Sequence, residues 1–174
     1  MLRLGCLVLL CGAAAFAADD VASAVVATVK KVDAGGKVVV VKTADGTEQT
    51  FKVVGHTAVH GAKDVGTGSV DAFHGLKEGD DVVVHYTVTG AAKTADEFDR
   101  VGKDGLKAME GTVKGIDHGA KTMTVKTADG AETTFHFTKT MAKETGKGAE
   151  KTGKVTVYYS DEAGKKIVHY FKEG

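Results

Sequence analysis

The hexapeptide Val41-Lys42-Thr43-Ala44-Asp45-Gly46 occurs a second time, unchanged, as Val125-Lys126-Thr127-Ala128-Asp129-Gly130. Around these two copies, 15 of the 24 positions in 28–51 are identical to their counterparts in 112–135 without a gap. Composition alone does not give such identity at a fixed offset, so the 174-residue chain contains an internal duplication.

The duplication predicts two small domains, because two copies are too few for a solenoid. The second half of the unit recurs more loosely. Residues 79–86 resemble 153–159, at a shorter offset than the one that separates 28–51 from 112–135. The first copy therefore carries extra residues, which we expect to form a loop between about 56 and 78. We predict domains at 22–102 and 107–174.

Both copies have the pattern of β-strands. Asp-Gly at 45–46 and at 129–130 is a strong hairpin signal, and we expect the turns at 33–36 and 117–120 to place glycine at positive φ. Apolar and polar residues alternate over 121–127, as in a half-buried strand. Three meandering strands, a long crossing and two further strands predict an all-β protein of two tandem five-stranded barrels of the OB or SH3-like kind.

The first residues have the features of a secretory signal peptide. Arg3 precedes the apolar run 4–10, and Ala15-Phe16-Ala17 matches the small-residue pattern of a cleavage site. The apolar run is too short for a permanent transmembrane helix. We therefore predict a signal peptide at 1–17, a periplasmic or secreted protein, and no integral membrane segment in the mature chain.

Both cysteines, Cys6 and Cys11, lie within this peptide, so the mature chain has neither disulfides nor thiolate ligands. Cys11 follows Leu10, whereas a lipidated cysteine would follow glycine or alanine. Lipidation at Cys11 is therefore disfavoured, although the alternative stays open.

Composition and motifs exclude several functions. Lys and Arg together number 23, as do Asp and Glu, and a neutral chain lacks the basic surface that nucleic-acid binding needs. None of the three serines lies in a nucleophile-elbow sequence, and no catalytic constellation is visible. We therefore expect no enzyme and no nucleic-acid partner.

Strands and turns follow one pattern through Gly111–Asp117, Lys121–Val125, Thr134–Phe137 and Gly153–Val157. This pattern resembles the small barrel of the periplasmic copper chaperones of efflux systems, and also related exported bacterial barrel domains without an assigned function. The resemblance covers most of 109–171 and, less closely, 25–101. It implies a shared barrel fold.

The resemblance does not extend to the copper site. The chaperones hold Cu(I) with one His, two Met and a capping Trp, and this chain has no Trp. The corresponding places hold residues that do not bind Cu(I), namely Lys126 or Thr127, Ala131 and Thr133 in the second copy and Lys42 or Thr43, Thr47 and Gln49 in the first.

The histidines of the first copy are the best candidate metal ligands. His56, His60 and His74 lie in the expected loop, and His56-x-x-x-His60 would place two imidazoles on one face of a helical turn. Neighbouring glycines weaken the helix, and a hydrated loop is the alternative. Apart from this possible divalent cation, we expect no cofactor.

Other polar groups have a simpler interpretation. His136 and His169 are expected on neighbouring strands, either as a surface pair or with His136 simply on a polar face, and His85 is expected on a polar face as well. The acidic run Asp96, Glu97 and Asp99 is expected to be a solvated strand end.

The sequence thus favours a non-enzymatic, exported tandem-barrel protein that binds or scaffolds an envelope protein or a small ligand of unknown identity. The alternative is a periplasmic protein that binds Cu or Zn through the histidines of the first copy.

Overall fold

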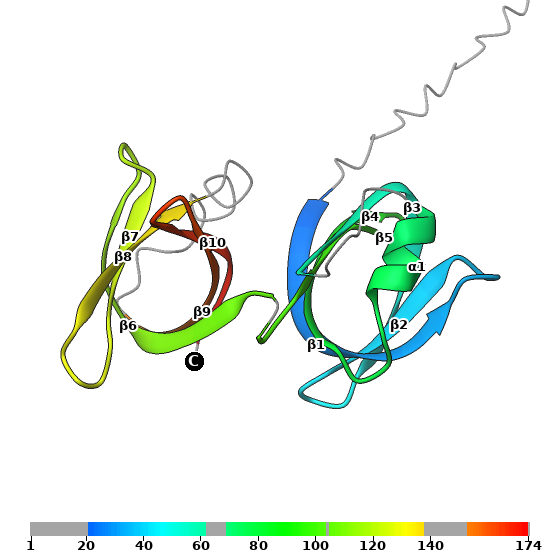
Figure 1. Cartoon of the computed structure of the whole chain (residues 1–174), viewed down its shortest axis with the longest axis horizontal. Helices are drawn as coiled ribbons and strands as arrows, with labels where there is room; N and C mark the ends of the chain where they lie inside the picture. Colours follow the sequence, from blue (N-terminus) through cyan, green and yellow to red (C-terminus); the bar gives the residue numbers. More distant parts are fainter. Residues whose placement is uncertain (1–20, 62–68, 104, 138–152, 174) are drawn as a thin grey trace, which may run out of the picture.

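The computed structural model describes residues 21–61, 69–103, 105–137 and 153–173. It contains two closed five-stranded barrels, seen side by side in Figure 1. The all-β prediction is confirmed. The predicted signal peptide and Cys11 lie outside the described residues.

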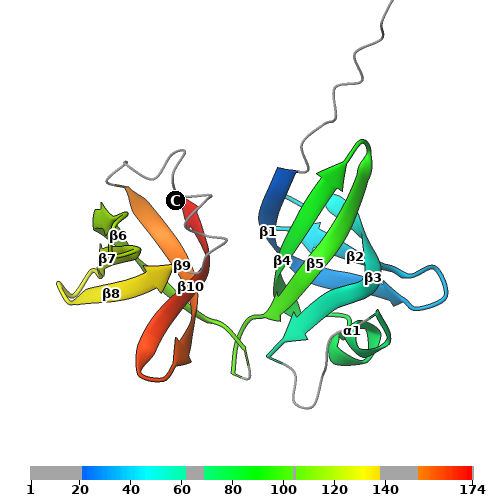
Figure 2. The ribbon, with the colours of Figure 1, turned by 90° about the horizontal axis from the view of Figure 1, so that it is seen from above.

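Barrel one consists of five strands and a short helix. The elements are β1 (Val21–Asp33), β2 (Val38–Thr43), β3 (Glu48–His60), α1 (Ser69–Gly75), β4 (Asp81–Thr89) and β5 (Ala92–Arg100). The strands close in the order β1-β2-β3-β5-β4, and β3 pairs with β5 in parallel. Helix α1 packs against β3 at one end of the barrel (Figure 2).

Barrel two repeats this plan without the helix among its described residues. Its strands are β6 (Lys107–Asp117), β7 (Thr122–Lys126), β8 (Glu132–Phe137), β9 (Lys154–Glu162) and β10 (Lys165–Glu173). They close in the order β10-β8-β7-β6-β9, with β8 and β10 parallel. The expected adjacency of the strands that bear His136 and His169 is therefore confirmed.

Equivalent residues of the two copies occupy equivalent places in separate cores. Val41 and Phe51 are fully buried in barrel one, as are Val125 and Phe135 in barrel two. Alternation along each strand produces these cores, because every second side chain points inward. No helix in the described ranges has the length and apolarity needed to cross a membrane.

The duplicated hexapeptides form matching hairpins, as predicted. Gly46 and Gly130 have φ of 89° and 88°, and each donates its amide hydrogen at 2.9 Å to the carbonyl of the threonine three positions earlier. Asp45 accepts the amide hydrogen of Thr47 at 3.1 Å, and Asp129 that of Ala131 at 3.2 Å.

Two expectations about loops are wrong. In the turns after β1 and β6 the positive φ belongs to Lys37 (52°) and Lys121 (54°), not to a glycine. Asp33 and Asp117 stabilise these turns by accepting amide hydrogens from Gly36 and Ala120. The extra residues of the first copy are not a simple loop either, because β3 continues to His60 and α1 follows.

Candidate functional site

A group of titratable side chains lies on the outer face of β3, β5 and β4. Phe98 points into the core, so its neighbours Glu97 and Asp99 point outward. The strand register sets His60 of β3 opposite Asp99, and His85 of β4 opposite Glu97. Three adjacent strands thus carry this group.

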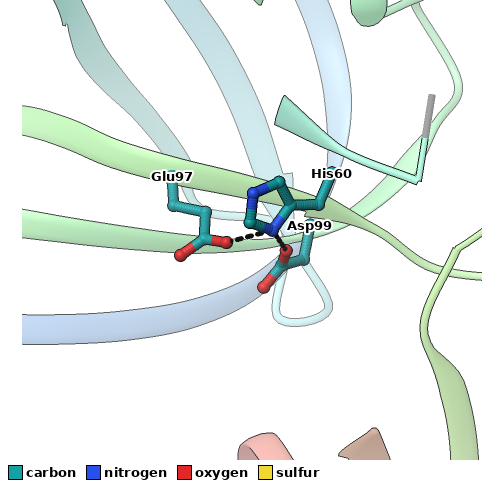
Figure 3. A group of neighbouring side chains, drawn as sticks. All are labelled: His60, Glu97 and Asp99. Carbon is teal, nitrogen blue, oxygen red and sulfur yellow. Dashed lines mark ion pairs between the residues drawn. The ribbon is translucent and has the colours of Figure 1, made fainter. Parts of the chain in front are cut away.

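Three of these side chains converge on one point. His60 Nδ1 lies 3.2 Å from Asp99 Oδ1 and pairs with Glu97 Oε1 (Figure 3). One ligand atom from each of His60, Glu97 and Asp99 lies within 4.8 Å of the other two, close enough for a single metal ion to contact all three.

Two further histidines face the other oxygen of Asp99. His85 Nε2 lies 3.5 Å from Oδ2, and His169 Nδ1 lies 3.2 Å from it. His169 belongs to β10, so barrel two contributes to the site. We call His60, His85, Glu97, Asp99 and His169 together the seam cluster.

Asp99 is the most unusual member of the seam cluster. Its side chain has no exposed surface, although it points away from the barrel core. Within the part of the chain that the structure describes, neither oxygen accepts a well-aligned hydrogen bond. Three imidazoles approach it without the alignment that a hydrogen bond requires, and a buried carboxylate left in this state is costly.

A bulge in β3 brings His60 to Asp99. Val53 pairs with Ala95 and Ala58 pairs with Glu97, so β3 uses extra residues between these two pairs. The buried hydroxyl of Thr57 accepts the amide hydrogen of Val54 at 2.9 Å and donates to the carbonyl of Ala95 at 2.7 Å. Thr57 therefore holds the bulge that sets the register of His60.

The electrostatics of the seam cluster favour positive charge beside Asp99. Asp99, followed by Glu97, raises the pKa of His60 to about 10, against partial burial that lowers it. Burial lowers the pKa of His169, but Asp99 outweighs it and the net shift is upward. Burial raises the pKa of Asp99, but the imidazoles of His169, His60 and His85 outweigh it and hold that pKa well below its usual range.

These donors suit a divalent cation of borderline softness. Imidazole nitrogen and carboxylate oxygen are ordinary zinc ligands, and imidazole also suits Cu(II) and Ni(II). Thiolates and thioethers, which Cu(I) prefers, are absent from the seam cluster. The side chains present therefore fit Zn²⁺ better than Cu(I) or an ion that requires oxygen ligands alone.

The three histidines predicted from the sequence do not come together. His60 belongs to the seam cluster, whereas His56 is exposed on β3 with Nε2 3.7 Å from Asp96, and His74 lies exposed on α1. Residues 56–60 form neither the helical turn nor the hydrated loop that the sequence analysis considered, because strand β3 runs through them. Metal binding by the predicted set stays a prediction.

Four members of the seam cluster escaped the sequence analysis. The acidic run was expected to be a solvated strand end, but Asp99 is fully buried and only 28% of the Glu97 side chain is exposed. His85 and His169 were expected on polar surfaces, but their side chains are 14% and 13% exposed. The acidic run and the histidines were visible in the sequence, but they lie far apart along the chain and only the fold brings them together.

Among its described residues, barrel two has no equivalent of this site. In barrel one, Val84 of β4 pairs with Phe98 of β5. The matching pair in barrel two is Val157 of β9 and Phe171 of β10. At that offset the counterparts of His85, Glu97 and Asp99 are Tyr158, Tyr170 and Lys172.

Among solved structures, the chain shows a weak likeness to a silver(I)-bound protein. No protein-family model matches the chain, and no curated protein matches it. The crystal structure of silver(I)-bound CusF matches with a TM-score of 0.34 and 14% sequence identity, over 45% of this chain and 96% of CusF. The evidence for the candidate site is its own geometry.

Proposed function

We propose that this chain is an exported, non-enzymatic binding protein whose ligand is a divalent transition-metal cation, with Zn²⁺ as the reference ion. The cation is held by His60 Nδ1 and one carboxylate oxygen each from Glu97 and Asp99. This is the metal-binding alternative of the sequence analysis with a different ligand set.

The observation that carries the proposal is the state of Asp99. Asp99 is a carboxylate with no exposed surface whose charge is balanced by the imidazoles facing it, and within the described residues neither of its oxygens receives an aligned hydrogen bond. A cation contacted by Asp99, Glu97 and His60 takes over this balancing role. It replaces the proton of His60, because a metal-bound imidazole must be neutral.

We further propose that the chain acts in the periplasm or outside the cell, without nucleic acid and without catalysis. A scaffold for an envelope protein remains the second candidate, although none of the described contacts identifies such a partner.

Calorimetric titration of Zn²⁺ into metal-free protein tests the proposal. We expect one ion per chain, with Mg²⁺ giving no competing signal. His60→Ala and Asp99→Asn should each weaken binding by more than the roughly 10–100-fold that loss of an outer-shell partner costs. Because the His60 side chain is 56% exposed, its replacement should leave the barrel folded.

His56→Ala and His74→Ala serve as matched controls, since both histidines are exposed and lie on the same barrel. Their Zn²⁺ affinity should equal that of the unchanged protein. If the unchanged protein binds no Zn²⁺, or if His60→Ala binds it equally well, the seam cluster is only a network of imidazole–carboxylate ion pairs.

A further inference from the structure

Asp99 connects the candidate metal site on barrel one with a side chain of barrel two. Its Oδ1 faces His60 at 3.2 Å, and its Oδ2 faces Nδ1 of His169 at 3.2 Å. One carboxylate therefore contacts both barrels, through a different oxygen on each side.

We propose that cation binding fixes the two barrels to each other through the Asp99–His169 contact. This inference rests on the proposed function, which places the cation against Asp99. His169 acts here as a positioning residue, because it holds the carboxylate that would contact the cation.

His169 is itself held from within barrel two. Its Nε2 lies 3.0 Å from the Ser160 hydroxyl and 3.7 Å from a carboxylate oxygen of Glu162, both on β9. Such outer contacts fix the ring of a histidine and tune the ligand that it supports. Ser160, Glu162 and His169 also line a cavity of about 260 Å³, whose other wall includes His60 and Asp99.

The outer face of barrel one is covered at this place. Val83 and Asp99 are opposite each other on β4 and β5, both point away from the core, and neither has exposed surface. The linker starts at the same edge, since Leu106 donates its amide hydrogen to the carbonyl of Arg100 at 2.7 Å. Barrel two therefore begins beside the metal site.

A link of this kind has a thermodynamic consequence. Domains joined by a short linker move relative to each other unless their interface is large and apolar. If the cation orders Asp99 and docking of His169 orders the same carboxylate, each event favours the other. Reciprocal coupling typically changes an affinity by about 5–150-fold.

Spin-label distances between the barrels test the inference directly. The chain after residue 17 has no cysteine, so Ala91→Cys and Ala131→Cys place one label on an exposed turn of each barrel. We expect Zn²⁺ to narrow the distance distribution in otherwise unchanged protein. In His169→Ala, the distribution should stay broad with Zn²⁺, and Zn²⁺ affinity should fall by roughly 10–100-fold.

Two further variants distinguish a positioning role of His169 from a general structural effect of replacing a histidine in barrel two. His169→Asn keeps a side-chain N–H donor near the place of Nδ1 and should restore both the affinity and the narrowing. His118→Ala removes an exposed histidine of barrel two and should change neither.

Each outcome has a distinct meaning. If Zn²⁺ binds with equal affinity to His169→Ala, or binds the unchanged protein without narrowing the distribution, the coupling is wrong while the metal site stands. If Zn²⁺ does not bind the unchanged protein at all, the metal site and the coupling are both wrong.

Discussion

Asp99 of barrel one and His169 of barrel two face each other at 3.2 Å, although each barrel has its own hydrophobic core. The carboxylate is fully buried and its partner almost so. This contact therefore joins a buried charged group of one barrel to a side chain of the other.

Replacement of Thr57 should disturb the site without touching a ligand. Thr57→Val keeps the shape of the side chain but removes both hydrogen bonds that close the β3 bulge. Unpaired buried groups cost about 1–3 kcal/mol, so the free energy of unfolding should fall by that amount. Zn²⁺ affinity should fall as well, because the bulge sets His60 opposite Asp99.

Thr57→Ser is the matched control, since it keeps the hydroxyl. Chemical denaturation and calorimetric titration of both variants measure the two effects. Equal Zn²⁺ affinity in Thr57→Val and the unchanged protein would show that the bulge does not position His60.

The equivalent aromatic pairs of the two cores should each stabilise their own barrel. Phe51 packs edge-to-face on Tyr86 with ring centroids 4.9 Å apart, and Phe135 packs on Tyr159 at 5.1 Å. Phe51→Leu and Phe135→Leu should each lose the ring interaction, which is worth about 0.5–1.5 kcal/mol beyond buried area. Amide hydrogen exchange should show reduced protection in the barrel that carries the change.

This prediction would be wrong if either substitution reduced protection equally in both barrels. Such a result would mean that the two cores unfold as one unit.

The twin hairpins should lose stability in acid together. Hydrogen bonds from the Thr43 hydroxyl and from Thr47 lower the pKa of Asp45, and those from the Thr127 hydroxyl and the Ala131 amide lower the pKa of Asp129. A carboxyl with a lowered pKa in the folded state contributes stability above its ordinary value of 3.8, and that contribution disappears as the pH falls below it.

Carbon-13 NMR titration of the side-chain carboxyl groups measures both pKa values in one sample. Both should lie below 3.8, and that of Asp45 should be the lower, because Asp45 alone also accepts a hydrogen bond from a second side-chain hydroxyl, that of Thr47. A pKa at or above 3.8 for either carboxyl would contradict the turn geometry described here.

Substitution of Gly105 in the linker should destabilise the protein. A Cβ at this position would lie 1.9 Å from the carbonyl oxygen of Arg100, so the linker backbone would have to move. Gly105→Ala should therefore lower the free energy of unfolding by about 1–3 kcal/mol, the range seen for overpacking. Thermal denaturation of the purified variant measures it.

Gly115→Ala is the corresponding control in β6, because a Cβ there would meet nothing within 4 Å. It should change stability by no more than about 0.5 kcal/mol. If both variants were equally stable, the close approach of Gly105 to Arg100 would not affect the free energy of unfolding.

Local chemistry made the barrels predictable from the sequence. The repeated Asp-Gly turns and the alternation around Val125 require only neighbouring residues to form. The positive φ at Lys37 and Lys121 was not predicted, because the local turn sequence misleads at these two positions. The sequence signal points to glycine, whereas here the Asp33 and Asp117 side chains cap the turn and a lysine takes up the left-handed conformation.

The candidate site was less predictable because its geometry depends on distant pairings. Alternation correctly places Glu97 and Asp99 outward, and an outward carboxylate is ordinarily solvated. The burial of Asp99 follows from the long bulged β3, which brings in His60, and from the neighbouring barrel, which brings in His169. Neither the bulge nor the packing of one barrel against the other has a local sequence signal.

Anomalous diffraction at the zinc edge, from crystals grown with Zn²⁺, tests the central claim most directly. The account predicts one peak on barrel one, about 2.0–2.2 Å from His60 Nδ1 and from one oxygen each of Glu97 and Asp99. A peak at His56 or His74 without these ligands, or no peak beside Asp99, would contradict it.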